Sequence, residues 1–420
     1  MSTADHALAC PPIGRVTDVV VVGAGPAGIA AAVGLRRAGR SIVVLDKARF
    51  PRDKCCGDGL TTLALRELEH LGLDPDEVPN WFDVDGARLR SPSGDEVVVP
   101  LPTVGRYAAI VPRVDLDASL VDLARTAGIE VLDGHGVVDV RSRTGHVDVV
   151  AEGLAPIRCR YVVAADGMWS PVRKLVGASV PGYRGEWHAF RQYASGVTGS
   201  ARDDLWVWFE PDLLPGYAWS FPLPGGRVNI GFGVLRDGSR RIRDMAELWR
   251  DLLERPHIRA ALGPDAVLEG RHTAWPIPAR VDDVALTHGR VLFVGDAAAA
   301  TDVMTGEGIG QALVTGRLAA EAIVTAGALQ PAVAADHYEG AVEHELFADH
   351  RMSRRLGRVL RHRRGAIGAI KVVAHSGEWG RRNFARWMFE DEPRAIVTSP
   401  SRWHRRFLDR PGAWAERTPA

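Results

Sequence analysis

Two adjacent cysteines, Cys55 and Cys56, stand in the stretch FPRDKCCGDGL, between charged residues and flexible glycines. A thiol with an ordinary pKa of about 8.5 is mostly protonated at neutral pH and can therefore donate a proton. The alternative is inert packing, which is the more common role of a buried cysteine. A disulfide between adjacent cysteines would be strained. The chemistry therefore depends on what the fold brings next to these thiols.

A glycine-rich turn precedes the cysteines. The stretch DVVVVGAGPAGIAAAVGLRRAGRSIVVLDK predicts a strand, a turn with Gly23-x-Gly25-x-x-Gly28, an alanine-rich helix and a second strand. In such a unit the first glycine permits the tight turn, the second lets the backbone approach a pyrophosphate, and the third lets the helix pack closely. Asp46 ends the second strand, where a carboxylate can bind ribose hydroxyls. The pattern predicts a dinucleotide site.

Two later stretches also place a loop at the end of an apolar strand. They are YVVAADGMWSPVRKLVG (residues 161–177) and RVLFVGDAAAATDVMTGEGIGQAL (residues 290–313), and the second runs into a helix predicted from about Ile309. Both are typical of ligand loops at strand ends. Arg113 precedes another predicted helix. A guanidinium suits bidentate pairing with phosphate, although a surface arginine is the alternative.

Aromatic residues alternate along predicted strands in the middle of the chain. Tyr217, Trp219 and Phe221 should share one face of a strand, and Trp206 and Trp208 should share a face of the strand before it. The next strand has the same alternation at Val228, Ile230, Phe232 and Val234. Together they predict an antiparallel sheet with a broad apolar face. That face is either core or the wall of a groove for a long apolar ligand.

The order of the three nucleotide motifs resembles flavoproteins of the para-hydroxybenzoate hydroxylase superfamily. Within it, FPRDKCCGDGL and the Tyr-x-Trp-x-Phe-Pro signature at residues 217–222 resemble the geranylgeranyl reductase family, and most of all its actinobacterial menaquinone side-chain reductases. These flavoproteins saturate carbon-carbon double bonds in prenyl chains. The resemblance, over residues 16–345, implies an α/β fold: a Rossmann-like FAD-binding domain with an inserted antiparallel-sheet substrate domain and a C-terminal helical segment.

FAD is the cofactor that the resemblance implies. Asp166 and Gly167 would lie near the flavin phosphates, Asp296 would bind the ribityl chain, and Arg113 would contact FAD. The other expected FAD contacts are Gly23, Gly25, Ala27, Gly28, Asp46, Lys47, Cys56, Gly57, Gly295, Gly306, Gly308 and Ile309. The expected substrate contacts are Trp206, Trp208, Tyr217, Trp219, Phe221 and Pro222. Cys55 and Val303 stand where the family usually has proline, so we expect less rigid loops at both places.

The implied reaction needs a proton source beside the flavin. An isolated alkene has no carbonyl to hold negative charge, so we expect a proton to arrive first and aromatic faces to stabilise the developing cation before hydride transfer. We expect Cys56, Asp58, Tyr217 and Trp219 to be the catalytic residues, with Cys56 facing the reaction site. The chain has no second Gly-x-Gly-x-x-Gly unit, so the reductant, NADPH or reduced ferredoxin, would bind transiently.

Length and composition limit the remaining classes. A chain of 420 residues with 46% apolar and 25% charged residues is typical of a globular protein with two or three domains. Lys plus Arg and Asp plus Glu both number 52, so no bulk attraction to nucleic acid follows. Four cysteines, no secretory signal and no apolar run of about 18 residues predict a cytoplasmic protein, at most attached to a membrane surface.

Domain boundaries follow from the resemblance. Residues 1–79, 104–176 and 274–342 should form a discontinuous FAD-binding domain, and residues 80–103 and 177–273 the substrate domain. The remainder, residues 343–420, should be helical and basic, since Arg351 to Arg386 contains eleven Lys or Arg and one acid. A basic amphipathic helix can lie on an anionic membrane, near a prenyl-lipid or quinone substrate. Equally, it can pack on the protein and leave a solvated charged face.

Two other functions stay open. A FAD-dependent monooxygenase or halogenase of the same fold could act on a hydrophobic or aromatic small molecule. Ala299 stands where hydroxylases commonly have histidine, and Tyr217 and Phe221 interrupt the tryptophan-rich motif of halogenases. The third hypothesis is a non-catalytic lipid or nucleic-acid binder that uses the basic tail. No metal is expected, because HELFADH (residues 344–350) has the wrong spacing for a zinc site.

Overall fold

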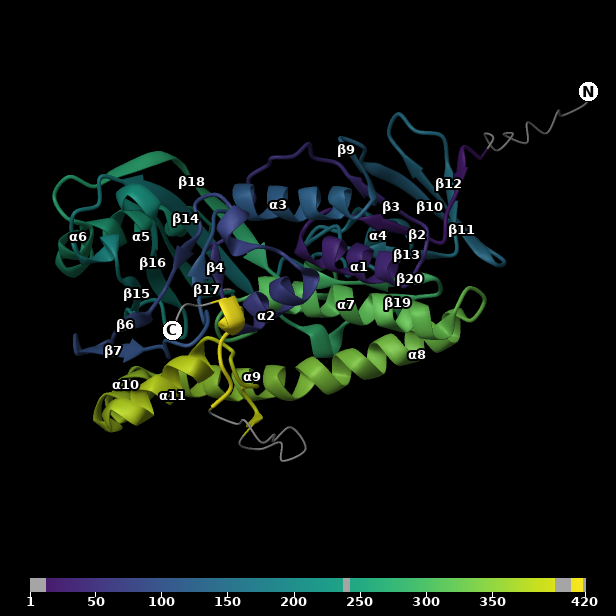
Figure 1. Cartoon of the computed structure of the whole chain (residues 1–420). Coiled ribbons are helices and arrows are strands. Elements are labelled where there is room, and N and C mark those ends of the chain that lie inside the picture. The colour runs from purple at the N-terminus through teal and green to yellow at the C-terminus, as the bar shows by residue number, and fades with distance from the viewer. Residues whose placement is uncertain (1–12, 237–241, 397–408, 418–420) are drawn as a thin grey trace, which may run out of the picture.

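The chain is described here from a computed structural model that covers residues 13–236, 242–396 and 409–417. Two sheet-containing units lie side by side, and a layer of long helices runs beneath both (Figure 1). One unit holds the glycine-rich turn, and the other holds the aromatic strands.

The first unit is built on a six-stranded sheet in which every strand except β19 is parallel to its neighbours. Its order is β19 (Thr287–His288), β20 (Val291–Phe293), β13 (Tyr161–Ala164), β2 (Val19–Val22), β3 (Ile42–Asp46) and β9 (Glu130–Asp133). The strand β2 consists of four buried valines, as expected for a parallel strand covered on both faces. The predicted strands at the three nucleotide motifs are therefore confirmed.

Helices α1 (Pro26–Arg37), α3 (Arg113–Thr126) and α7 (Ile309–Ala326) pack around this sheet. Helices α1 and α7 approach very closely, since a Cβ atom at Gly316 would lie 2.1 Å from the carbonyl oxygen of Ala27. Small residues on both helices permit this contact. The start of α7 at Ile309 agrees with the sequence prediction.

The second unit is a seven-stranded sheet that is antiparallel except between β15 and β6. Its order is β18 (Val267–Ile277), β14 (Trp187–Ser195), β17 (Arg227–Leu235), β16 (Tyr217–Leu223), β15 (Leu205–Trp208), β6 (Gly86–Arg90) and β7 (Glu96–Pro100). The predicted antiparallel arrangement of β15, β16 and β17 is confirmed. The strand β18 runs across the expected domain boundary at residue 273.

Smaller elements complete the two units. A four-stranded sheet has the order β1 (Arg15–Val16), β12 (Ile157–Cys159), β11 (His146–Ala151) and β10 (Val137–Arg143). A three-stranded sheet joins β4 (Gly59–Leu60), β8 (Ala109–Ile110) and β5 (Phe82–Asp83). The remaining α-helices before the C-terminal region are α2 (Thr62–Leu71), α4 (Pro171–Leu175), α5 (Ile242–Glu254) and α6 (Pro256–Leu262).

The strand register decides which aromatic residues face the neighbouring unit. Trp206 pairs with Ser220, and Trp208 pairs with Ala218, so both tryptophans lie on the face opposite to that of Trp219. They belong to a packed cluster that includes residues of α5. Pro222 lies on this same face. The sequence-based placement of Trp206, Trp208 and Pro222 in the substrate site is therefore wrong. Their side chains lie on the face of the sheet that packs against α5, and those of Tyr217, Trp219 and Phe221 lie on the other face.

The C-terminal region is not a separate body. Helix α8 (Pro331–Val342) continues through a π-helical turn (Glu343–Phe347) into α9 (Ala348–Leu360), so the expected boundary at residue 343 falls inside one long helical ridge (Figure 1). Helices α10 (Arg363–His375) and α11 (Gly377–Met388) then pack beneath β7. Residues 1–12, 397–408 and 418–420 of the expected terminal segments lie outside the described residues.

After α11 the chain returns to the first unit. The carbonyl of Phe389 accepts a hydrogen bond of 2.8 Å from the backbone N–H of Thr62, at the start of α2. Further on, the ring of Trp414 meets that of Trp81 edge to face, with centroids 6.0 Å apart. Trp414 belongs to the core of the first unit, whereas the side chain of Phe389 packs in the core beneath the aromatic sheet, so the C-terminal segment contacts both units.

Gly231 and Gly233 on β17 offer a matched test of how the aromatic wall is packed. A Cβ atom at Gly231 would lie 2.4 Å from the indole of Trp219 and 2.3 Å from the backbone oxygen of Phe190. We expect Gly231→Ala to lower the free energy of unfolding by about 1–3 kcal/mol. A Cβ atom at Gly233 would lie 4.0 Å from its nearest neighbour, the indole of Trp219. Gly233→Ala should therefore change the free energy of unfolding by less than about 1 kcal/mol. Urea unfolding measures both, and equal losses would contradict this packing.

Candidate functional site

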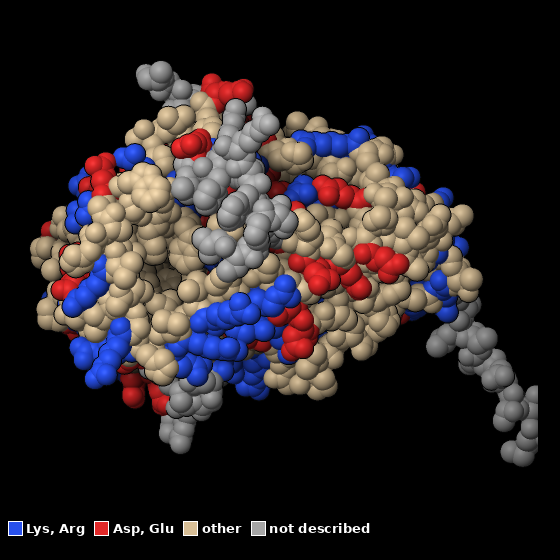
Figure 2. All heavy atoms as spheres, turned by 90° about the horizontal axis from the view of Figure 1, so that it is seen from below, with Lys and Arg blue, Asp and Glu red and all other residues tan. Residues whose placement is uncertain are grey.

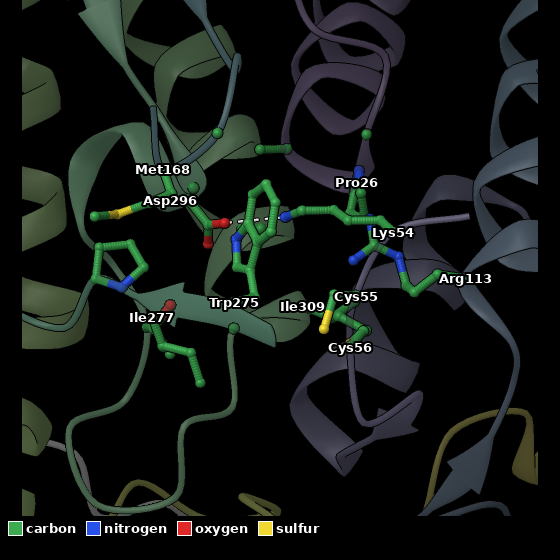
Figure 3. A pocket seen from close by; sticks show the side chains of 18 of the residues that line it. Pro26, Lys54, Cys55, Cys56, Arg113, Met168, Trp275, Ile277, Asp296 and Ile309 are labelled. Atoms are coloured by element: carbon green, nitrogen blue, oxygen red, sulfur yellow. Dashed lines mark hydrogen bonds and ion pairs between the residues drawn. The ribbon is translucent and has the colours of Figure 1, made fainter. Parts of the chain in front are cut away.

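One cavity of about 880 Å³ lies where the two units meet. Its walls come from the glycine-rich turn, the cysteine turn, the loops after β13 and β20, and the strands β14, β16 and β18. Its size lies within the usual range for cofactor and ligand sites. Figure 3 shows residues from both units pointing into this common space.

The glycine-rich turn is shaped to receive an anion at one end of the cavity. Gly23 has φ +104°, and a Cβ atom there would lie 2.2 Å from the carbonyl oxygen of Ala165. A Cβ atom at Gly28 would likewise lie 1.8 Å from the carbonyl oxygen of Gly23. Gly25 is different, because its nearest neighbours are the guanidinium groups of Arg52 and Arg113, at 3.7 and 4.0 Å. The backbone at Gly25 is therefore open to a phosphate flanked by two cations.

A buried carboxylate that the sequence analysis missed holds these cations. Asp117 on α3 accepts hydrogen bonds from Arg113 at 2.7 and 2.8 Å and from Arg52 at 2.7 Å. Burial alone would lower the pKa of Arg113, but the charge of Asp117 and its hydrogen bonds raise it. Burial likewise opposes ionisation of Asp117, and the two arginines nevertheless lower its pKa. The cluster carries one net positive charge, which suits a phosphate.

Asp46 lies at the end of β3, as predicted, and closes the turn. Its two carboxylate oxygens accept hydrogen bonds of 2.8 Å from the backbone N–H groups of Ala24 and Ala48. Each carboxylate oxygen can accept a further bond, so ribose hydroxyls remain suitable ligands. The residues around Gly25 therefore fit the adenosine and pyrophosphate parts of a dinucleotide.

Two more acidic residues stand at strand ends around the cavity. Lys54 of the cysteine turn forms an ion pair of 2.9 Å with Asp296, which follows β20 (Figure 3). Asp166 follows β13 and accepts hydrogen bonds from the Ser170 hydroxyl at 2.6 Å and the Val172 N–H at 2.8 Å. Burial raises the pKa of Asp166 to about 6. Asp166 thus shapes its own loop, whereas Asp296 ties the cysteine turn to the loop after β20.

The cysteine turn forms part of the cavity wall. Burial raises the pKa of the Cys56 thiol to about 11, so the thiol is neutral at physiological pH. Burial also raises the pKa of Cys55, whose sulfur accepts a hydrogen bond of 3.2 Å from Thr273. A Cβ atom at Gly57 would lie 3.4 Å from the ring of Phe221, so the turn packs directly against the aromatic strand.

Asp58 lies behind this turn and not among the residues that line the cavity. Its carboxylate accepts hydrogen bonds from the Tyr193 hydroxyl at 2.6 Å, the Asn229 amide at 2.7 Å and the Arg113 N–H at 3.3 Å. Burial raises the pKa of Asp58 to about 6 despite these bonds. Asn229 also donates to the carbonyl of Cys56 at 2.9 Å. The arrangement makes Asp58 a residue that positions the turn.

The wall next to the cysteine turn is aromatic. Tyr217, Trp219 and Phe221 line the cavity from β16, with neighbouring ring centroids 6.0 Å apart. Trp219 donates a hydrogen bond of 3.1 Å to Asn229. Trp275 of β18 also lines the cavity (Figure 3), and its buried indole N–H finds no acceptor among the described residues. A ligand acceptor in the cavity would satisfy it.

The loop after β20 is held firmly although Val303 replaces proline. Asp302 accepts hydrogen bonds from the N–H groups of Met304 and Thr305, at 3.0 and 2.8 Å. Its second oxygen accepts from the Ser353 hydroxyl, at 2.6 Å. The Tyr217 hydroxyl donates to the carbonyl of Thr305. These bonds supply the restraint that proline would give, so the expected loss of rigidity at Val303 is offset.

Comparisons with known proteins agree with this geometry. The family described as FAD binding domain matches residues 16–316. A menaquinone reductase from Mycolicibacterium smegmatis is 36% identical over 348 residues, which are 76% of this chain and 81% of that protein. A digeranylgeranylglycerophospholipid reductase from Methanopyrus kandleri is 32% identical over 312 residues, 72% of this chain and 76% of that protein. The chain belongs to the geranylgeranyl reductase family of FAD-binding proteins.

Solved structures share the fold of this geranylgeranyl reductase family member. A geranylgeranyl bacteriochlorophyll reductase-like protein from Thermoplasma acidophilum has a TM-score of 0.76 and 21% identity, covering 93% of this chain and all of that one. A halogenase in complex with FAD has a TM-score of 0.69 and 16% identity, covering 91% of this chain and 84% of that one. The fold alone therefore does not separate reductases from halogenases, whereas the sequence relatives favour the reductase.

Most expected FAD contacts of this family member surround the cavity. Those that line it are Gly23, Gly25, Ala27, Asp46, Lys47, Cys56, Gly57, Arg113, Asp166, Gly167, Gly295, Asp296, Gly306, Gly308 and Ile309. Gly28 instead lies behind the turn. Residues missed by the sequence analysis are Arg52, Lys54, Asp117, Tyr193, Asn229, Trp275 and Glu307. Asn229 left a signal, since it is a polar residue inside an alternating apolar strand.

Gly25 and Gly28 test the assignment of the anion site. Gly25→Ala should leave the fold of the FAD-free protein intact, because no atom lies within 3.7 Å of the new Cβ, yet weaken FAD binding at least about tenfold by obstructing the pyrophosphate. Gly28→Ala should instead destabilise the protein itself, because its Cβ would meet a backbone oxygen at 1.8 Å. Flavin fluorescence titration and thermal unfolding separate the two effects. Undiminished FAD affinity in Gly25→Ala would refute the site.

Proposed function

We propose that this flavoprotein saturates carbon-carbon double bonds in the isoprenoid chain of a membrane lipid or quinone, with a menaquinone side chain as the first candidate. The observation that carries the proposal is the shared cavity, in which a dinucleotide-binding end continues into an aromatic wall. An isoprenoid chain has no polar handle along its length, so an apolar wall is what its recognition requires. The names of the relatives at 36% and 32% identity support this substrate class.

Bound and reduced FAD would supply the hydride for such a reduction. The protein would hold the cofactor through the Gly25 turn, the Arg113 cluster and Asp46. Tyr217, Trp219 and Phe221 would hold the alkene and stabilise positive charge that develops on its more substituted carbon. Because these rings fill the wall on β16, they would also exclude water from the reacting carbons.

Cys56 and Asp58 have different proposed roles. Cys56 lines the cavity, so its thiol would contact the flavin or the alkene directly. Asp58 would act through its bonds to Asn229, Tyr193 and Arg113, which set the position of the turn. We further propose that NADPH or reduced ferredoxin delivers electrons in a transient encounter, since the sequence has one Gly-x-Gly-x-x-Gly unit.

A peripheral membrane contact through the C-terminal helices belongs to the same proposal. Within the described part of the chain, no helix is long and apolar enough to cross a bilayer. Exposed basic residues gather on α9, on α10 and on the short link between them, namely Arg351, Arg355, Arg358, Arg361, Arg363, Arg364 and Lys371. Three large apolar side chains on the same helices are also exposed to solvent: Val359 on α9 (53%), Val372 on α10 (72%) and Trp379 on α11 (69%). Figure 2 shows Lys and Arg side chains gathered beside a hollow on this face of the molecule.

Not every residue of this basic stretch is free for lipid. Arg354 pairs with Asp282 at 2.6 Å, and Arg386 is buried against Asp391. The buried apolar positions Ile370 and Val373 pack against the protein body. The inner face of these helices therefore packs on the protein, as one of the two sequence hypotheses expected. Their outer face carries cations and exposed apolar side chains, which suit an anionic membrane surface, the other hypothesis.

The reductase proposal is tested by anaerobic turnover. Dithionite-reduced protein, incubated with menaquinone or with digeranylgeranylglycerophospholipid, should yield products heavier by two mass units for each bond reduced. Trp219→Ala should lower this rate at least about tenfold while FAD binding persists, because the indole belongs to the proposed alkene wall. Mass spectrometry measures the product. Substrate-dependent oxygen consumption with a hydroxylated or halogenated product would support the monooxygenase or halogenase alternative instead.

The membrane contact is tested by vesicle sedimentation. Arg355→Glu together with Arg358→Glu should reduce binding to phosphatidylglycerol-containing vesicles at least about tenfold, since each basic residue near an anionic surface contributes roughly 1 kcal/mol. Asp122→Lys on α3, an exposed charge change on another helix, serves as the control. Binding that is unchanged by the double substitution, or that is equally strong on pure phosphatidylcholine, would contradict a charge-driven contact.

A further inference from the structure

Glu307 is an acidic residue in the cavity wall that neither the nucleotide motifs nor the reductase signature accounts for. It precedes Gly308 and α7, in the loop after β20. Its carboxyl oxygen lies 3.7 Å from the place that a Cβ atom at Gly59 would occupy, and the same place is 3.3 Å from the ring of Phe221. The carboxyl group therefore reaches the point where the cysteine turn meets the aromatic wall.

The surroundings of Glu307 keep its carboxyl group neutral. Among the residues that the structure describes, none donates a hydrogen bond to that carboxyl group. Burial raises its pKa to about 8, and the nearby charge of Glu390 adds to the rise. Arg394 acts in the opposite direction, and Asp302 acts with Glu390. At neutral pH the cavity therefore contains a protonated carboxylic acid.

The charged residues near Glu307 pair with one another. Glu390 accepts hydrogen bonds of 3.0 Å from Thr61 and from Gln311, and Arg394 lies 3.2 Å from it. Arg394 also lies 3.4 Å from Asp302. Because Arg394 is shared between these two carboxylates, its charge offsets only part of the rise in the pKa of Glu307. This explains why Glu307 retains its proton although an arginine is close.

Tyr217 and Cys56 also bear protons on this part of the wall. The Tyr217 hydroxyl already donates to the carbonyl of Thr305, and burial raises its pKa. Cys56 and Glu307 differ in acidity. The pKa of the thiol is about 11, against about 8 for the carboxyl group. The carboxylic acid is thus about a thousandfold stronger. An alkene is a very weak base, so the stronger acid that is still protonated at working pH is the better donor.

We propose that the Glu307 carboxyl group is the general acid that protonates the alkene carbon, while Cys56 is a contact of the flavin or alkene. This inference rests on the proposed prenyl reduction. The O–H bond of Glu307 breaks, and the π electrons of the alkene form the new C–H bond at the less substituted carbon. Reduced FAD, when bound, would supply the hydride for the other carbon and with it the two electrons that reduce the alkene. Glu307 is left as a carboxylate and regains a proton from solvent.

Single-turnover kinetics test the role of Glu307. Holoenzyme reduced under anaerobic conditions is mixed with menaquinone in detergent micelles, and flavin reoxidation and product mass are followed. Glu307→Gln should slow reoxidation about 10²- to 10⁴-fold, with FAD affinity within about threefold of the wild type. The wild-type rate should fall above pH 8, as the acid ionises, and this limb should be absent in Glu307→Gln. Glu247→Gln, an exposed substitution on α5, is the matched control.

A second readout does not need turnover. The pKa of Glu307 in the folded protein is raised above its ordinary value of 4.5, so the stability that its proton provides is lost as pH rises towards about 8. The melting temperature of the holoenzyme should therefore fall relative to that of Glu307→Gln between about pH 5 and 8. If the difference in melting temperature between the wild type and Glu307→Gln stays constant from about pH 5 to 8, Glu307 is not protonated in the folded protein and the proposal is wrong.

The outcomes are distinguishable. Absence of any reduced product with wild-type protein overturns the proposed function, and the inference falls with it. Product formation by the wild type, together with a Glu307→Gln rate within threefold of it, overturns the inference alone. Removal of the alkaline limb by Cys56→Ala, with the limb retained in Glu307→Gln, would also overturn it and assign the proton to the thiol.

Discussion

The site depends on one buried carboxylate, Asp58, that is held by three different elements. Its φ of 66° is unusual for a residue with a side chain, and the group is fully buried. Desolvating a carboxylate costs several kcal/mol, whereas each hydrogen bond to a charged group returns about 1.5–3 kcal/mol. The pKa of about 6 shows that burial outweighs the bonds, yet the group remains mostly ionised at neutral pH. It therefore joins Tyr193, Asn229 and Arg113 to the cysteine turn.

This constraint explains how the two units come to share a cavity. Arg113 belongs to the nucleotide-binding unit, whereas Tyr193 and Asn229 belong to the aromatic sheet. Their common partner, Asp58, fixes the cysteine turn between them. The C-terminal segment reinforces the same junction, since Glu390 and Arg394 pack behind the loop after β20. A cofactor held by one unit would thus face a substrate held by the other.

Register on the aromatic sheet is the second constraint. Side chains alternate with a period of two, so the phase of β16 decides whether its aromatic rings face the cavity or the packed layer beneath α5. Tyr217, Trp219 and Phe221 face the cavity, and the positions opposite them on β17 are Gly233, Gly231 and Asn229. The two glycines leave room for the indole of Trp219, and Asn229 bonds its N–H. The strand β17 therefore links the shape of the aromatic wall, through its two glycines, to the position of the cysteine turn, through Asn229.

The sequence by itself determined the local features: the β2-turn-α1 unit, the acid at Asp46, the loops after β13 and β20, and the alternation on β16. These depend on periodicity, turn chemistry and steric limits within about 30 residues, which a single chain displays directly. The face assignment of Trp206 and Trp208 failed, because alternation gives a period and not the phase between strands. Asp117, Trp275 and Glu307 were decided only by tertiary structure. Burial, desolvation and pairing arise between segments far apart in the chain, and they alone turn such ordinary residues into a site.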